Sequence, residues 1–180
     1  LQTWLELNDT MIRRLQKVME IDELFFAEDI CYNHGLLISP STWREFLKPP
    51  YVELIGRVRS RQNRKLHIQI DSDGNVTEAI PLYMEIGMDI MSPFEVAAGN
   101  DVVALRDTYP TLKILGGIDK RVLAKDFDAI DDHLERTVPF MRDHHGYIPT
   151  CDHHVPLEVS LENFLYYRRR IVELGWEEGG

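Results

Sequence analysis

Apolar residues recur along the chain in patterns that predict a regular succession of helices and strands. An opening helix is predicted to end near residue 19, and its apolar residues are spaced three or four apart: Trp4, Leu7, Met11, Leu15 and Val18. Short apolar runs that stop at polar residues then alternate with further helical patterns. The predicted strands are 24–27, 66–70, 89–91, 112–115 and 147–149, and helices follow them within about 40–58, 79–86, 101–109, 127–143 and 161–174.

Five strand–helix units in a row indicate a parallel sheet. No turn signal such as Asn-Gly joins adjacent strands, so we expect each connection to pass through a helix. Each of the five strands also ends in polar or acidic residues. In a barrel all strand ends meet at one mouth, whereas in an open sheet only the strands near the switch point carry a site. The pattern therefore favours an α/β fold of the TIM-type (β/α)8 barrel.

The length of the chain predicts a partial barrel. A complete barrel needs about 250 residues, whereas 180 residues hold about five units. Because the sequence starts at Leu1 inside a predicted helix, we expect residues 1–180 to be a single domain that forms the C-terminal part of a barrel. Unpaired strand edges invite pairing with another chain, which predicts self-association of this part.

Composition and charge argue against several classes of function. The net charge of -10 and the pI of about 5.1 disfavour nucleic-acid or anionic-membrane partners, which require a basic surface. No run approaches the ~20 apolar residues of a membrane span, and no secretory leader opens the chain, so a cytoplasmic location is expected. Cys31 and Cys151 form no CxxC pair, which disfavours a disulfide scaffold or a zinc ribbon.

Charged residues and histidines gather where the predicted strands end. Any one of them also suits a helix N-cap or a turn. Five successive strand ends carry such residues, however, and in a barrel all five ends face one mouth. We therefore expect the functional site there. The candidates are Glu28, Asp29, Asp71, Asp73, Glu95, Asp119, Lys120, Asp152 and His153.

Asp71, Asp73 and His153 are the candidate catalytic residues. Asp71 and Asp73 lie two positions apart on one strand extension, so both side chains can point into the same mouth. With the imidazole of His153 they suit two kinds of chemistry. They can hold a divalent metal ion, or they can form a general acid/base pair whose pKa values shift each other. The structural alternative is a plain turn at residues 71–75.

Several segments together resemble the uroporphyrinogen decarboxylase superfamily, which includes decarboxylases of haem synthesis and cobalamin-linked methyltransferases. The resemblance spans about Phe25 to Gly175 and implies a (β/α)8 barrel. It rests on Ala27-Glu28-Asp29, Leu36 to Pro40, Asp71 to Asn75, Gly116 to Lys120, Cys151 to Pro156 and Leu161-Glu162-Asn163.

The resemblance also implies roles for matching positions. The methyltransferases hold zinc with a His-x-Cys pair and a later Cys, and the similar positions here are Asp71, Asp73 and His153. All three differ in type, so the implied metal site is rich in oxygen. His153 also matches the histidine in the Gly-His-Gly segment of the decarboxylases.

The resemblance implies an enzyme, and the acidic mouth favours methyl transfer. A porphyrinogen with many carboxylates needs cations around it, whereas a metal or an acid at the mouth suits activation of a small methylated substrate. The acceptor would be a corrinoid carried by a partner protein. The pocket would be shaped by Glu28, Asp29, Glu95, Asp119, Lys120 and Asp152. Decarboxylation of uroporphyrinogen, a non-catalytic binding module and an inactive fragment are the alternatives.

Overall fold

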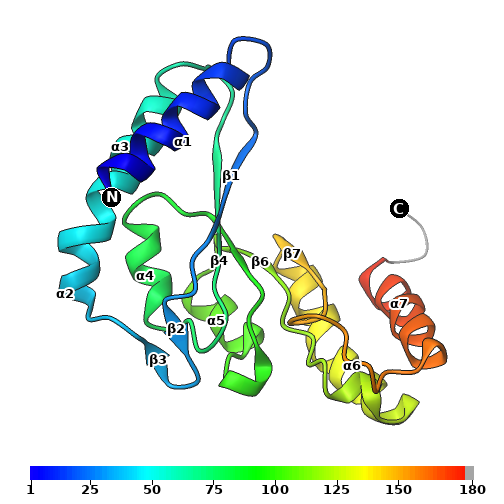
Figure 1. The fold of residues 1–180 in the computed structure, drawn as a ribbon. Coiled ribbons are helices and arrows are strands. Elements are labelled where there is room, and N and C mark those ends of the chain that lie inside the picture. Colours follow the sequence, from blue (N-terminus) through cyan, green and yellow to red (C-terminus); the bar gives the residue numbers. More distant parts are fainter. Residues whose placement is uncertain (177–180) are drawn as a thin grey trace.

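The chain forms a five-stranded parallel sheet with helical connections (Figure 1). The computed structural model describes residues 1–176. Every neighbouring pair of strands is parallel, and the strands follow one another in sequence order across the sheet. The predicted α/β arrangement is thereby confirmed. The strands are β1 (Glu23–Ala27), β4 (His67–Asp71), β5 (Ile90–Ser92), β6 (Lys113–Leu115) and β7 (Tyr147–Ile148).

Helices connect and cover these strands. They are α1 (Gln2–Leu15), α2 (Pro40–Thr42), α3 (Lys48–Arg59), α4 (Ala79–Met84), α5 (Val102–Thr108), α6 (Phe127–Asp143) and α7 (Leu161–Gly175). Helix α1 packs on α3, and α6 lies beside α7 (Figure 1). One apolar core lies between the sheet and its helices, and a second, smaller one lies around α6 and α7. Within residues 1–176, no helix is both long enough and apolar enough to cross a membrane.

Side chains cap the first amides of α5, α6 and α7, as Ser39 does for α2. The Asp101 carboxylate accepts from the amides of Val103 and Ala104, and Asp126 and Ser160 cap α6 and α7 in the same way. These caps satisfy backbone donors that have no partner inside the helix. They explain why the predicted starts of these helices agree closely with the observed ones.

The predicted buried face of the first helix was wrong. Leu7, Met11 and Leu15 are exposed, while Leu5 and Asp9 are buried. The helix is turned this way because the Asp9 carboxylate pairs with Arg57 and Arg61 from α3 and its neighbouring turn, at 3.1 and 2.7 Å. Helix α1 also ends at Leu15 rather than near residue 19.

The segment between β1 and α3 differs from the expected loop and single helix. Residues 31–36 form a small antiparallel hairpin of β2 (Cys31–Tyr32) and β3 (Gly35–Leu36). After α2, a π-helical stretch η1 (Trp43–Leu47) precedes α3. Pro49 and Pro50 follow after Lys48, and neither can donate the backbone hydrogen bond that an α-helix requires, so the regular ladder is interrupted here.

Candidate active site at the strand ends

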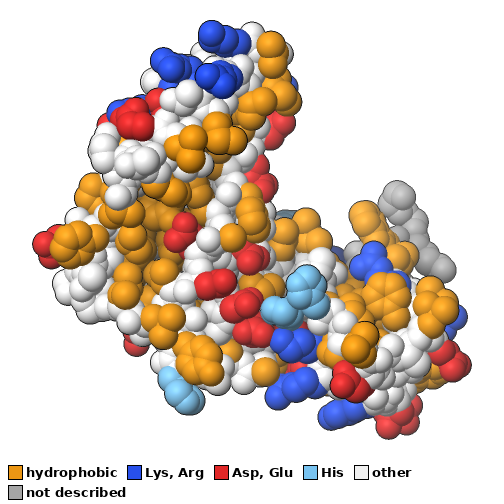
Figure 2. All heavy atoms as spheres, viewed as in Figure 1, with side chains coloured by type: hydrophobic (Ala, Val, Ile, Leu, Met, Phe, Trp, Pro, Cys, Tyr) orange, Lys and Arg blue, Asp and Glu red, His pale blue; other side chains and the backbone are white. Residues whose placement is uncertain are grey.

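The C-terminal ends of the parallel strands surround an open cavity of about 460 Å³. Acidic side chains gather beside histidines on this face of the molecule (Figure 2). The cavity includes four of the predicted site residues: Asp29, Asp71, Asp73 and His153. Its full lining is Phe25, Asp29, Gln69, Asp71, Asp73, Ser92, Pro93, Leu115, Thr150, Cys151, His153 and His154.

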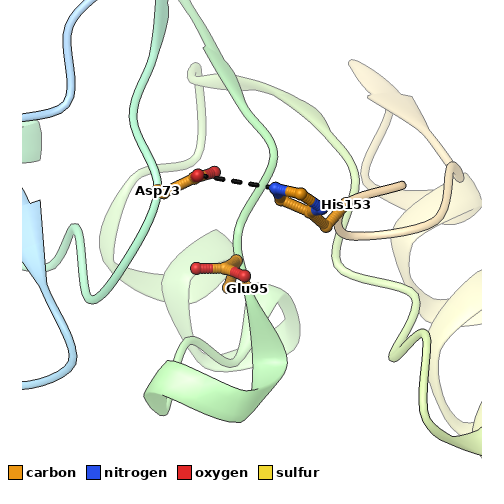
Figure 3. A group of neighbouring side chains, drawn as sticks. All are labelled: Asp73, Glu95 and His153. Carbon is orange, nitrogen blue, oxygen red and sulfur yellow. Dashed lines mark ion pairs between the residues drawn. The ribbon is translucent and has the colours of Figure 1, made fainter. Parts of the chain in front are cut away.

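Three side chains from three different loops converge beside this cavity, and two of them, Asp73 and His153, line it (Figure 3). Asp73 follows β4, Glu95 follows β5 and His153 follows β7. Each offers one metal-ligating atom, and these three atoms lie within 4.8 Å of one another. Asp73 and His153 point toward each other, with 3.5 Å between Oδ2 and Nε2. We call Asp73, Glu95 and His153 the strand-end triad.

The two carboxyl groups of the triad have pKa values shifted in opposite directions. Burial raises the pKa of Asp73, and the nearby Glu95 charge adds to this effect. Burial also acts to raise the pKa of Glu95, but hydrogen bonds from Lys120 and the Gly74 amide outweigh it, so this pKa is lowered. Glu95 is therefore held as a carboxylate, while Asp73 takes up a proton more readily.

Lys120 neutralises Glu95 rather than facing the cavity. Its Nζ lies 2.7 Å from Glu95 Oε1, and the Gly74 amide donates to Glu95 Oε2 at 2.9 Å. Both oxygens of this carboxylate therefore already have a donor. Lys120 was predicted to contact the substrate, but it does not line the cavity.

Asp71 lines the cavity but is not part of the triad. The strand register places Asp71 opposite Ser92, and the Ser92 hydroxyl donates to the Asp71 carboxylate. The Gln69 side chain in turn donates to the Ser92 hydroxyl at 3.0 Å. Glu95, which we predicted as a pocket residue, joins Asp73 and His153 instead. The sequence did contain a signal for this, because Glu95 also follows a strand end.

Asp29 and Glu28 are adjacent in sequence but lie in different surroundings. Asp29 lines the cavity, and its carboxylate accepts from the Asp73 amide at 3.2 Å. Glu28 lies instead in a separate cavity of about 240 Å³, beside Trp4 and Tyr51. Burial raises the pKa of Glu28, and its hydrogen bond with Tyr51 opposes that shift.

Asp119 and Asp152, predicted as substrate contacts, are buried and do not line the cavity. The Asp119 carboxylate accepts from the Arg121 guanidinium at 2.7 Å. The Asp152 carboxylate accepts from two backbone amides, those of Val96 and Lys120. Sequence reasoning missed Cys151 as a cavity-lining residue, although it directly precedes Asp152; His154, which shares a strand end with His153, also lines the cavity.

The parallel strands, their helical connections and a polar site at the strand ends define a barrel-type α/β enzyme class. The chain belongs to the uroporphyrinogen decarboxylase (URO-D) family, whose sequence model matches residues 9–172. Its sheet is a partial TIM-type barrel of that family, and the predicted membership is confirmed. No curated protein matches the chain.

Proposed function

We propose that this chain forms the metal-binding part of the mouth of a URO-D-family methyltransferase. The reaction would pass a methyl group from a small methylated substrate to a corrinoid carried by a partner protein. The observation that carries the proposal is the strand-end triad, in which two carboxylates and one imidazole meet beside an acidic cavity that Asp73 and His153 line.

The triad fits a divalent metal ion such as zinc. Zinc binds carboxylate oxygen and imidazole nitrogen at about 2.0–2.2 Å, so neighbouring ligand atoms of a tetrahedral ion lie about 3.4 Å apart. Asp73 and His153 already have nearly this spacing, at 3.5 Å. Glu95 offers the third ligand atom within 4.8 Å of the other two, and to bind zinc it would share an oxygen that now accepts from Lys120 or the Gly74 amide. Three protein ligands leave a fourth position open, where a bound zinc ion would polarise the substrate's leaving group.

The charge of the cavity selects against polycarboxylate substrates. Asp29, Asp71 and Asp73 line it, and none of its lining residues in the described part of the chain is Lys or Arg. The Lys120 ammonium is paired with Glu95. A neutral or cationic methyl donor is attracted or tolerated by such a field, whereas a substrate with many carboxylates is repelled.

Proton transfer is the role that the residues themselves support. Without a metal ion, its raised pKa makes Asp73 the carboxyl group of the triad better suited to give a proton to a departing group, whereas as a zinc ligand it would be ionised. Glu95, held by Lys120 and the Gly74 amide, stays ionised and supplies negative charge to a cation. His153 completes the set from the opposite loop.

Decarboxylation of uroporphyrinogen is the alternative, and the family's name is the observation that favours it. Such a reaction requires cations to receive the substrate carboxylates. No Lys or Arg lines the cavity among the described residues.

Turnover of variants tests the proposal. We expect zinc-loaded protein to methylate cob(I)alamin, a surrogate for the carrier, from a methylamine or a methoxylated compound. The Co(I) centre takes the methyl group to give methylcobalamin, and the leaving group takes a proton. Asp73→Asn and His153→Ala should each lower the rate at least about 100-fold, as followed by the cobalamin absorbance.

His34→Ala is the matched control, because His34 is exposed in the hairpin and outside the cavity. Its rate should equal that of the wild type. Full activity in the Asp73 and His153 variants would remove these residues from the mechanism. Release of CO2 from uroporphyrinogen, with no methyl transfer, would favour the alternative.

A further inference from the structure

We propose that Asn100 and Asp152 are positioning residues that hold the strand-end triad together. Each is a buried polar side chain that ties two of the triad's loops to one another. The inference rests on the proposed function only for its zinc readout, because the geometry and the hydrogen-exchange readout are independent of any metal.

Asp152 joins the loops after β5, β6 and β7. Its side chain is fully buried. Oδ2 accepts from the Val96 amide at 2.8 Å and Oδ1 accepts from the Lys120 amide at 3.0 Å. Val96 directly follows Glu95, and His153 directly follows Asp152. One carboxylate therefore fixes the spacing between the loops that carry Glu95 and His153.

The buried Asp152 carboxylate depends on its two backbone hydrogen bonds. Burial raises the pKa of this carboxyl, and the amides of Val96 and Lys120 act against that shift. No cation donates a hydrogen bond to the Asp152 side chain among the described residues, so backbone amides alone satisfy its oxygens. A buried acceptor is expensive to leave unsatisfied, so loss of either amide bond should move the loops.

Asn100 joins the loops after β4 and β5 and is 3% exposed. Its Oδ1 accepts from the Val76 amide at 3.1 Å, and its Nδ2 donates to the carbonyls of Gly74 and Glu95, both at 2.8 Å. Both amide donors and the carbonyl oxygen of this side chain are used. Asn100 thus fixes the backbone beside Asp73 against the backbone of Glu95 itself.

The two positioning residues act on the same carboxylate from opposite sides. The Gly74 amide, in the loop tied by Asn100, donates to Glu95 Oε2. The Lys120 ammonium, in the loop tied by Asp152, donates to Glu95 Oε1. The orientation of Glu95 therefore depends on both anchored loops. A change at Asp152 should consequently be felt at Gly74, which Asp152 does not contact.

Asp152→Asn and Asn100→Asp test the inference in the full chain. Asp152→Asn keeps the size of the side chain but replaces one acceptor with a donor that faces an amide. Asn100→Asp removes both donors and places a carboxylate against two carbonyls. The first readout is amide hydrogen exchange without metal. We expect Asp152→Asn to speed exchange at least about 10-fold at Val96 and Lys120, and also at Gly74; Asn100→Asp should do so at Val76 and Gly74.

Asn163→Asp is the matched control. The Asn163 side chain also donates to two carbonyls, those of Leu123 and Lys125, but it lies outside the cavity lining. This variant should leave exchange at Gly74, Val76 and Val96 unchanged. Unchanged exchange at Val96 or Val76 in the test variants would overturn the proposed ties, and an unaffected Gly74 in Asp152→Asn would overturn the coupling.

The second readout is zinc titration of folded protein. Loss of residues that orient metal ligands lowers affinity about 10–100-fold, and we expect this for both test variants but not for Asn163→Asp. Wild-type zinc affinity in both variants would overturn the positioning role. If the wild type binds no zinc, the proposed function is wrong but the positioning role is not thereby excluded. Hydrogen exchange at Gly74 then tests the positioning role.

Discussion

Gly116 shows how closely the strand-end loops approach one another. It follows β6 with φ of +116°, a conformation that side chains other than glycine rarely adopt, and an added Cβ would overlap the Pro93 carbonyl. We expect Gly116→Ala to lower the free energy of unfolding by about 2 kcal/mol or more. The measurement is urea denaturation.

Gly56→Ala is the control for this substitution. Gly56 lies inside α3, and an added Cβ would meet nothing within 4 Å. Alanine should therefore stabilise the helix by up to about 1 kcal/mol. Equal stability of Gly116→Ala and the wild type would contradict the close approach of the two loops.

At the level of residues, the sequence indicates where the site lies better than which side chains meet. Asp73 and His153 come together as expected, because parallel strand ends converge. Asp71 takes Ser92 as its partner instead, and this depends on strand register, which no local pattern reveals. Asp152 looked like a pocket residue, but two backbone amides from distant loops bind it. Such long-range partners cannot be read from spacing alone.

At the level of elements, Glu85 links the end of α4 to the start of α3. Hydrogen bonds from Arg44 and Lys48 lower the pKa of Glu85 to about 2, from an ordinary value of 4.5. A lowered pKa stabilises the fold above the ordinary pKa, and this contribution is lost as the pH falls from about 4.5 toward about 2. Because the Glu85 side chain is partly exposed to solvent, we expect this loss of stability to be modest.

Glu85→Gln removes this pH dependence. Its Tm should lie below that of the wild type at pH 6, and the difference should shrink as the pH approaches 2 in thermal melts read by circular dichroism. Glu45→Gln, an exposed position in η1, is the control and should follow the wild type. A Tm difference that stays constant with pH would show that the ion pairs do not link α4 to α3.

The order and type of the main elements could be predicted, whereas some details could not. Strong periodicity and capping side chains located α6 and α7 well. The buried face of α1 was missed because a charged residue, Asp9, turns inward to meet two arginines. The hairpin of β2 and β3 was missed because its strands are only two residues long.

At the level of the whole molecule, the sheet has two outer strands. β1 and β7 each have one neighbour in the five-stranded sheet of the described residues, and Phe25 and Ile148 on them are exposed. Open edges favour pairing with another chain. We predict that this chain self-associates at micromolar concentration, as measured by light scattering. A clean monomer under those conditions would contradict the prediction.

The central claim is that Asp73, Glu95 and His153 bind a divalent metal ion. Mass spectrometry of metals retained by protein purified without chelators tests it most directly. We predict close to one zinc or other divalent ion per chain in the wild type and in His34→Ala, and its loss in Asp73→Asn and His153→Ala. Wild-type protein that retains no metal, even after dialysis against zinc, would contradict the claim.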